Sequence, residues 1–252
     1  MNSIIIRFYE ELNDFITPEK KKKPFSYTFQ GHPSVKDAIE AIGVPHTEVD
    51  LIVINGESMG FDYQLQHGDR VAVYPVFESL DISPLVKLRE KPLRQSRFIV
   101  DVHLGKLARL LRLLGFDTLY RNDYEDREIV DISQKDNRIV LTRDQGLLKH
   151  KTITHGYWLR SQTPIKQLQE VCLRYDLFSQ LSPFQRCIRC NGILEPVDKA
   201  EIHDQLPEKV ANTYTRFSRC QSCHNIYWAG SHYERLHKIV KHIQNIGEKN
   251  HV

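Results

Sequence analysis

The sequence lacks any apolar run close to the ~18–20 residues that a membrane-spanning helix requires, and its mean hydropathy is −0.45. A transmembrane segment is therefore excluded. The first residues, MNSIIIRFYE, contain no basic stretch ahead of a long apolar one, so we expect no secretory signal peptide. Internal repeats and low-complexity tracts are absent as well. Since 40% of the residues are hydrophobic, the chain is expected to form ordinary globular cores. Without a signal peptide or a long apolar run, we expect these domains in the cytoplasm and not at a membrane.

Cysteine is scarce, with five residues in 252. In a reducing cytoplasm, paired cysteines bind metals or perform redox chemistry more often than they form structural disulfides. Four of the five form two C-x-x-C pairs, Cys187/Cys190 and Cys220/Cys223. This spacing lets two thiolates approach one ion at ~2.3 Å, and two such pairs complete a tetrahedral structural zinc site. Redox chemistry is the alternative for a single C-x-x-C pair, but the tandem arrangement favours zinc.

The sequence around the cysteine pairs suits a zinc ribbon. Turn-prone residues follow each pair, at 191–192 and 224–225. The 29 residues between Cys190 and Cys220 exceed a usual ribbon insert, and we expect an excursion around 201–209 to absorb them. His224 and His232 are possible substitute ligands, although four cysteines already close the coordination shell.

Charge is distributed unevenly along the chain, whose total is +3. Residues 1–80 hold seven Lys and Arg against twelve Asp and Glu, a net charge of −5. Residues 81–252 hold 28 against 20, a net charge of +8. The basic part is the candidate for nucleic-acid binding, although modest charge differences between domains are also common.

The first 80 residues resemble a ubiquitin-like β-grasp domain of the sulfur-carrier type. Two strand-like segments, IIIRFYEEL and PFSYTFQG, precede a short helix that Ser34 would cap and Gly43 would end. Further strands follow around a turn at Asn55-Gly56. Carriers of this type act through a free C-terminal Gly-Gly, which is missing here because the last strand continues as VAVYPVFESLDISP. Carrier chemistry is therefore disfavoured, and a protein partner for this domain is expected instead.

Strand and helix patterns alternate from Phe98 onwards, after a segment at 81–96 that we interpret as a linker. This alternation predicts a parallel three-layer α/β domain, in which active sites gather at the carboxyl ends of the strands. Acidic residues fall at these places: Asp101, Asp123, Asp126 and Asp144. Clustered carboxylates repel unless a cation neutralises them, and hard oxygen ligands suit Mg²⁺ or Mn²⁺. Each Asp has an alternative role as a helix N-cap, above all Asp126.

Basic residues accompany the acids and are candidates for contacts with a phosphate backbone. They are Arg97, Lys106, Arg109, Arg112 and Arg143. The three-residue steps from Lys106 to Arg112 are equally typical of the solvated face of an amphipathic helix. Near the second cysteine pair, aromatic residues alternate with arginines and either stack on bases or form the ribbon's own core. They are Tyr214, Phe217, Tyr227 and Trp228; for Phe217 we favour the core.

The segments FIVDVHLGKLARLLRLLGFDTLYRNDYED and RIVLTRDQGLLKH resemble the Mut7-C domain, a PIN-like ribonuclease domain with an attached zinc ribbon, and RCIRCNGILEPV continues the likeness. The resemblance implies a metal-dependent ribonuclease with Asp101, Asp126 and Asp144 as its acids and Asp123 as a substitute or helper. The Glu that many PIN enzymes carry after the first strand has no counterpart between Asp101 and Asp117.

The sequence thus predicts a multidomain chain. Its parts are an α+β β-grasp domain at 1–80, a linker at 81–96, a PIN-like α/β domain at 97–182, and a zinc ribbon with a closing helix at 183–246. The predicted function is RNA cleavage with Mg²⁺ or Mn²⁺ as cofactor and Zn²⁺ as a structural ion. The alternative is a non-catalytic RNA-binding adaptor that uses the PIN-like domain and the ribbon.

Overall fold

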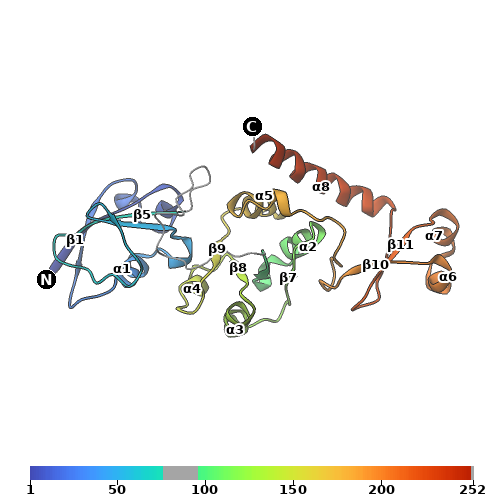
Figure 1. Cartoon of the computed structure of the whole chain (residues 1–252), viewed down its shortest axis with the longest axis horizontal. Helices are drawn as coiled ribbons and strands as arrows, with labels where there is room; N and C mark the ends of the chain where they lie inside the picture. The colour runs from blue at the N-terminus through green and yellow to red at the C-terminus, as the bar shows by residue number, and fades with distance from the viewer. Residues whose placement is uncertain (76–95, 251–252) are drawn as a thin grey trace. The chain divides into compact units, whose positions relative to one another are not determined.

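The computed structural model describes residues 1–75 and 96–250 (Figure 1). The predicted linker at 81–96 lies outside the described residues except for residue 96. The chain divides into two compact units, one formed by 1–95 with 126–158 and the other by 96–125 with 159–252. We describe the contacts of each unit by itself.

The N-terminal sheet has five strands in the order β2-β1-β5-β3-β4. β1 pairs with β5 in parallel, whereas β1/β2, β3/β5 and β3/β4 are antiparallel. This confirms the predicted β-grasp arrangement, with one helix packed on the sheet by a continuous apolar core. The elements are β1 (Asn2–Phe8), β2 (Phe25–Phe29), α1 (Val35–Ile42), β3 (Leu51–Ile54), β4 (Glu57–Ser58) and β5 (Arg70–Tyr74).

The ends of α1 and the β3–β4 turn form as the local sequence predicts. Ser34 and Asp37 make a reciprocal capping box, since the Asp37 N–H donates to Ser34 Oγ at 3.1 Å and the Ser34 N–H to Asp37 Oδ2 at 3.2 Å. Gly43 ends the helix with φ +128°, a conformation that side-chain-bearing residues rarely adopt. Asn55 and Gly56 both have positive φ, as tight hairpin turns require.

The central sheet has the strand order β7-β6-β8-β9. β6 pairs in parallel with β7, and β8 in parallel with β9, which confirms the predicted parallel α/β architecture. The residues of β6 and β8 are all buried, and all but Thr142 at the end of β8 are apolar. The elements are β6 (Phe98–Val100), α2 (Gly105–Leu113), β7 (Thr118–Leu119), α3 (Asp126–Asp136), β8 (Ile139–Thr142), α4 (Gln145–Leu148), β9 (Gly156–Trp158) and α5 (Pro164–Arg174).

The C-terminal region is an antiparallel sheet in the order β10-β11-β12, followed by a long helix. Two short helices lie between β10 and β11, and they absorb the long insert between the cysteine pairs as predicted. The elements are β10 (Leu194–Val197), α6 (Lys199–Ile202), α7 (Glu208–Thr213), β11 (Phe217–Cys220), β12 (Ile226–Trp228) and α8 (Ser231–Asn250).

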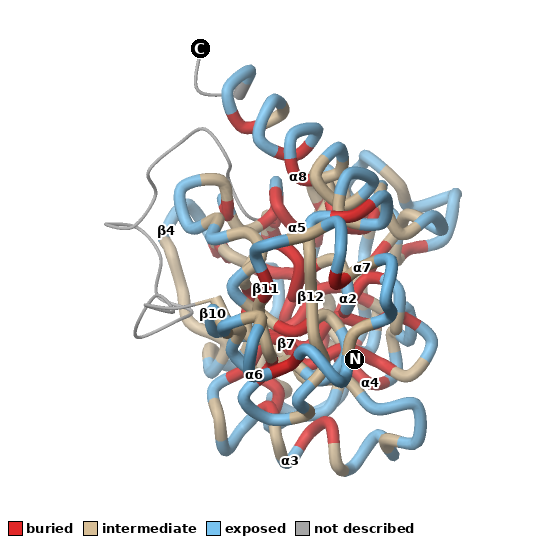
Figure 2. Tube along the Cα trace, turned by 90° about the vertical axis from the view of Figure 1, so that its right-hand side faces the viewer, coloured by how far each residue is buried: buried red, intermediate tan, exposed pale blue. Residues whose placement is uncertain are grey.

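Burial follows the amphipathic pattern of these elements. Figure 2 shows buried turns that recur along α8. The buried residues of α8 include Val240 and Ile243, which are 3% and 0% exposed. No helix in the described part of the chain combines the length and the apolar character needed to span a bilayer.

Candidate functional site

Four cysteine thiols from the two C-x-x-C turns converge at one point. Their sulfur atoms all lie within 4.8 Å of one another, with 3.6 Å between Cys187 and Cys223 and 3.4 Å between Cys190 and Cys220. A tetrahedral zinc ion with bonds of ~2.3 Å would hold its sulfurs about 3.8 Å apart. The two predicted pairs therefore come together as a metal site, and four thiolates are a donor set that fits zinc.

The backbone of each C-x-x-C turn is shaped by the residue that follows it. Asn191 and His224 have φ of +74° and +57°, and their N–H groups donate to the carbonyls of Cys187 and Cys220 at 2.9 and 3.0 Å. Gly192 has no room for a side chain, because an added Cβ would lie 2.8 Å from Cys220 Sγ. The turn-prone residues noted in the sequence thus aim both pairs of thiols at one point.

Tyr227 supports the cysteine site, a role that sequence reasoning missed. Its hydroxyl lies 3.0 Å from Cys187 Sγ, from a position 40 residues away that no spacing rule connects. Burial disfavours the Cys187 thiolate, but hydrogen bonds from Tyr227 and from backbone N–H groups outweigh it and lower the pKa of Cys187 to about 7. Burial and the neighbouring thiols raise the pKa of Cys190 to about 12. Several thiolates this close together repel one another, and a bound divalent cation would neutralise their charge.

Arg112 fastens the first cysteine turn to the central domain. It is 3% exposed; its Nε donates to the Thr118 carbonyl at 2.9 Å, and a terminal nitrogen donates to the carbonyls of Ile188 and Arg189 at 3.4 and 2.9 Å. Burial lowers the pKa of Arg112, opposed by the nearby thiols. The prediction that Arg112 contacts the phosphate backbone of RNA is wrong, because its buried guanidinium donates to backbone carbonyls of the protein.

Asn191 and Arg186 also attach the first cysteine turn to the central domain. The Asn191 side chain accepts from the Thr118 N–H at 3.0 Å and donates to Asp117 Oδ1 at 2.8 Å. Arg186 donates to the carbonyls of Gly115 and Asn191 at 3.1 and 3.0 Å. The ribbon is therefore held against the end of α2 and the start of β7 by hydrogen bonds of Arg112, Asn191 and Arg186.

The two strand-end acids occupy different environments. Asp101 directly follows β6 and is 7% exposed. Asp144 follows β8 by one residue, is exposed, and caps α4 by accepting from the Gly146 N–H at 2.7 Å through Oδ1. The N-cap role that was one alternative for these acids thus applies to Asp144.

Asp126 and Asp123 are both exposed. Asp126 is the first residue of α3. Asp123 pairs with Arg121 Nε at 2.9 Å, and this hydrogen bond lowers the pKa of Asp123. Asp101 and Asp123 belong to one compact unit, and Asp126 and Asp144 to the other. Convergence of these acids on one metal stays a prediction.

The remaining basic candidates are on the surface. Arg97, Lys106, Arg109 and Arg143 are all exposed, in contrast to Arg112. Lys106 and Arg109 lie on α2, one turn apart. Their side chains are available to an anion from the face of the helix that does not enter the core.

The aromatic residues of the ribbon divide between core and surface. Phe217 is 4% exposed, which confirms its predicted place in the ribbon core. Tyr227 serves the cysteine site, as described above. Trp228 is half-buried and lines a groove of the same region.

A separate contact inside the first unit joins the β-grasp domain to β9 and the loop before it. His46 Nε2 lies 2.7 Å from the Ile153 carbonyl, and Glu48 accepts from the Trp158 N–H at 2.6 Å. The Phe15 and Trp158 rings pack with centroids 5.1 Å apart. The Trp158 indole in turn donates to the Arg143 carbonyl at 3.1 Å. The β-grasp domain thereby contacts the strand that supports the Arg143–Asp144 segment.

Comparison with known proteins identifies both parts of the chain. Residues 96–240 match the family model described as the Mut7-C RNAse domain, and residues 1–81 match the model described as Mut7-C ubiquitin. Neither a curated protein nor a solved structure gives a significant match.

Proposed function

Because the chain belongs to the Mut7-C RNAse family, we propose that it is a metal-dependent ribonuclease that hydrolyses RNA phosphodiesters. The observation that carries the proposal is the family match over 96–240, which spans every acid of the predicted site. The position of Asp101 supports it further. Asp101 stands at the carboxyl end of a buried parallel strand, and active sites of such sheets gather at that edge.

Asp101, Asp126 and Asp144 would hold Mg²⁺ or Mn²⁺, with Asp123 as a helper. A bound cation of this kind would stabilise the charge of the scissile phosphate and activate a water molecule for attack. The carboxylates contribute oxygen ligands from a strand end and two helix starts, which fixes their backbone positions. Asp144 also accepts a hydrogen bond from the Gly146 N–H through Oδ1, which caps α4. Without a Glu after the first strand, one cation per site is the simplest fit.

Four exposed cations would guide the RNA backbone to these acids: Arg97, Lys106, Arg109 and Arg143. Such contacts neutralise phosphates without reading sequence. Arg112 is not among them, since its guanidinium binds backbone carbonyls of the ribbon.

The cysteine site would hold one structural Zn²⁺, bound by Cys187, Cys190, Cys220 and Cys223. Four protein ligands leave no open coordination position, so we assign the ion no part in the reaction. We infer a cytoplasmic location, because a reducing compartment keeps the four thiols available to the metal. The ubiquitin-like domain would bind a protein partner through its surface rather than act as a carrier.

A cleavage assay on the zinc-loaded full chain tests the proposal. Single-stranded and structured RNAs are incubated with Mn²⁺, with Mg²⁺, with Ca²⁺, or without an added divalent ion. Cleavage with Mn²⁺ or Mg²⁺ alone is the expected result. The adaptor alternative, to which the missing Glu points, predicts tight RNA binding and no cleavage with any ion; that outcome would replace the enzyme proposal.

A further inference from the structure

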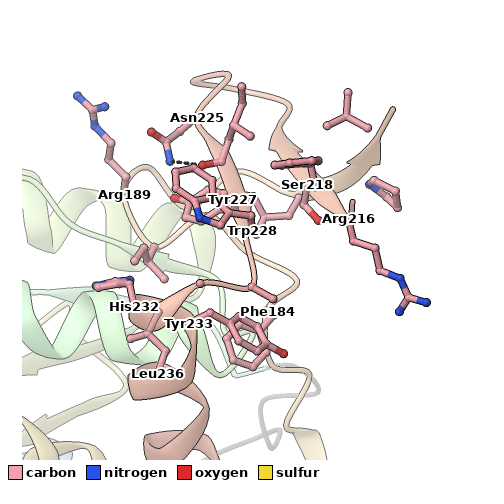
Figure 3. Close-up of a pocket in the computed structure, with 18 of the residues that line it drawn as sticks. Phe184, Arg189, Arg216, Ser218, Asn225, Tyr227, Trp228, His232, Tyr233 and Leu236 are labelled. Atoms are coloured by element: carbon pink, nitrogen blue, oxygen red, sulfur yellow. Dashed lines mark hydrogen bonds between the residues drawn. The ribbon is translucent and has the colours of Figure 1, made fainter. Parts of the chain in front are cut away.

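A groove of about 1130 Å³ opens between the ribbon sheet, α2 and the first turns of α8 (Figure 3). All of its lining residues belong to the second compact unit. The groove is larger than the ~300–1,000 Å³ that encloses a drug-sized ligand.

The charge of the groove is strongly one-sided. Its lining includes five Lys and Arg side chains and one carboxylate, that of Asp198. The cations are Arg109, Arg186, Arg189, Lys199 and Arg216. Arg186 is engaged with two backbone carbonyls, but Arg109, Arg189 and Arg216 are exposed. In Figure 3 the guanidinium groups of Arg189 and Arg216 extend outward at opposite ends of the ribbon. A polyanion is the complementary ligand.

Aromatic rings supply a second kind of contact. Trp228, Phe184 and Tyr233 line the groove and are half-buried, so part of each ring reaches solvent. Phe184 and Tyr233 pack with ring centroids 4.6 Å apart, which holds both in place. Trp228 is held by the approach of Gly230, where an added Cβ would lie 3.0 Å from the indole Nε1. Fixed rings of this kind can stack on nucleobases at low entropic cost.

The start of α8 adds to the preference for phosphate. Ser231 and His232 line the groove at the first turn of this twenty-residue helix, where the helix dipole favours negative charge. Acidic peptides would satisfy the cations but would leave the aromatic rings unused. The combination of exposed arginines with exposed ring faces therefore favours nucleic acid over peptide.

We propose that this groove binds a single-stranded RNA segment, with phosphates on Arg109, Arg189 and Arg216 and bases stacked on Trp228 and Tyr233. The proposal rests on the proposed ribonuclease function for its choice of RNA. It adds that the zinc ribbon is a substrate-holding surface with a preference for unpaired nucleotides. A duplex is a poorer ligand because its bases are stacked internally and cannot reach the rings.

Tryptophan fluorescence tests the groove separately from cleavage. The chain has two tryptophans, so Trp158→Phe leaves Trp228 as the sole reporter. Adding Asp101→Asn to this variant prevents turnover during a titration with oligouridylate. We expect saturable quenching of Trp228 by single-stranded RNA, weaker quenching by an RNA duplex and none by polyglutamate. Binding of RNA without quenching, or stronger quenching by polyglutamate, would overturn the proposal.

Arginine variants provide matched controls. Arg216 lines the groove, whereas Arg219, on the same segment, is outside it and lies 3.6 Å from Glu201. Arg216→Gln should weaken RNA binding and reduce the slope of log affinity against log salt by about one, and Arg219→Gln should do neither. Trp228→Ala should weaken binding by about 5-fold or more, with zinc content measured to show that the ribbon is intact. Equal losses for the two arginine variants would contradict a specific groove.

The two proposals fail in different ways. If RNA binds and quenches Trp228 but the parent protein does not cleave it, the ribonuclease proposal is wrong and the proposal of an RNA-binding groove stands. If RNA does not quench Trp228, and Arg216→Gln and Trp228→Ala leave cleavage unaffected, the proposal of an RNA-binding groove is wrong and the ribonuclease proposal stands.

Discussion

Neighbouring basic residues of one helix have different roles here. Arg109 is exposed, and Arg112, one turn later, is buried and binds three backbone carbonyls. Their spacing in the sequence is that of one amphipathic face, so no local pattern separates them. What separates them is the first cysteine turn, which the fold brings to Arg112 from 76 and 77 residues away.

Arg112→Ala should therefore destabilise the protein. The change leaves three backbone carbonyls without a charged donor, and hydrogen bonds to charged groups contribute ~1.5–3 kcal/mol each at most. We expect a loss of about 2–4 kcal/mol in the free energy of unfolding, measured by urea denaturation of the zinc-loaded chain. Arg109→Ala, the matched exposed change, should alter stability by less than about 0.5 kcal/mol. Equal stability of the two variants would show that Arg112 does not anchor the ribbon.

At the scale of elements, helix caps and turns could be predicted from the sequence, because they depend on residues that are neighbours in the chain. The capping box at Ser34 and Asp37, the turn at Asn55-Gly56 and the positive φ after each cysteine pair all form as their residue types dictate. The contacts that were missed join distant elements. Tyr227 reaches Cys187, and His46 reaches the Ile153 carbonyl 107 residues away, and only the tertiary fold brings such pairs together.

Loss of the cysteine site should destabilise the ribbon strands and leave the central sheet unchanged. Cys187→Ser removes one ligand and the partner of the Tyr227 hydroxyl, so we expect loss of zinc and faster hydrogen exchange in β10, β11 and β12. Exchange in β8 should stay unchanged. Cys172→Ser is a fitting control, because Cys172 is buried away from the metal group and its loss should leave the zinc content at one per chain. Zinc retained in Cys187→Ser would contradict the four-cysteine site.

The folded state of the first unit should lose stability in acid, because His46 is buried where the β-grasp domain meets the loop before β9. Burial lowers the pKa of His46 below 6.5 and Lys36 adds to this, while the hydrogen bond to the Ile153 carbonyl and the Glu40 carboxylate oppose it. A histidine with a lowered pKa binds fewer protons folded than unfolded, so its contribution is complete above pH 6.5 and declines as the pH falls below that value. Urea midpoints measured from pH 7.5 to 5.5 should show this decline, and His46→Gln should flatten it. Parallel profiles for the two proteins would exclude His46 as the cause.

The whole molecule combines two modules of opposite charge. The first 80 residues carry −5 and the remainder +8, and the basic part contains the cations of both the predicted acid site and the groove. Strand and helix alternation predicted the order of elements in the central domain, because each apolar strand is buried on both faces. Sequence spacing could not predict the groove. One wall comes from α2, which is separated in the chain from the ribbon strands and α8 by the rest of the central domain.

The claim that the acids serve catalysis is tested by comparing the parent protein with Asp101→Asn and Asp131→Asn. Asp131 is an exposed acid of α3 outside the predicted site, so its replacement controls for the lost charge. Single-turnover cleavage of labelled single-stranded RNA in Mn²⁺ and RNA affinity are measured on the same preparations. We predict that Asp101→Asn cleaves at least about 100-fold more slowly while binding RNA as tightly or more tightly, and that Asp131→Asn cleaves normally. Cleavage by Asp101→Asn at the parent rate would contradict the metal-dependent mechanism.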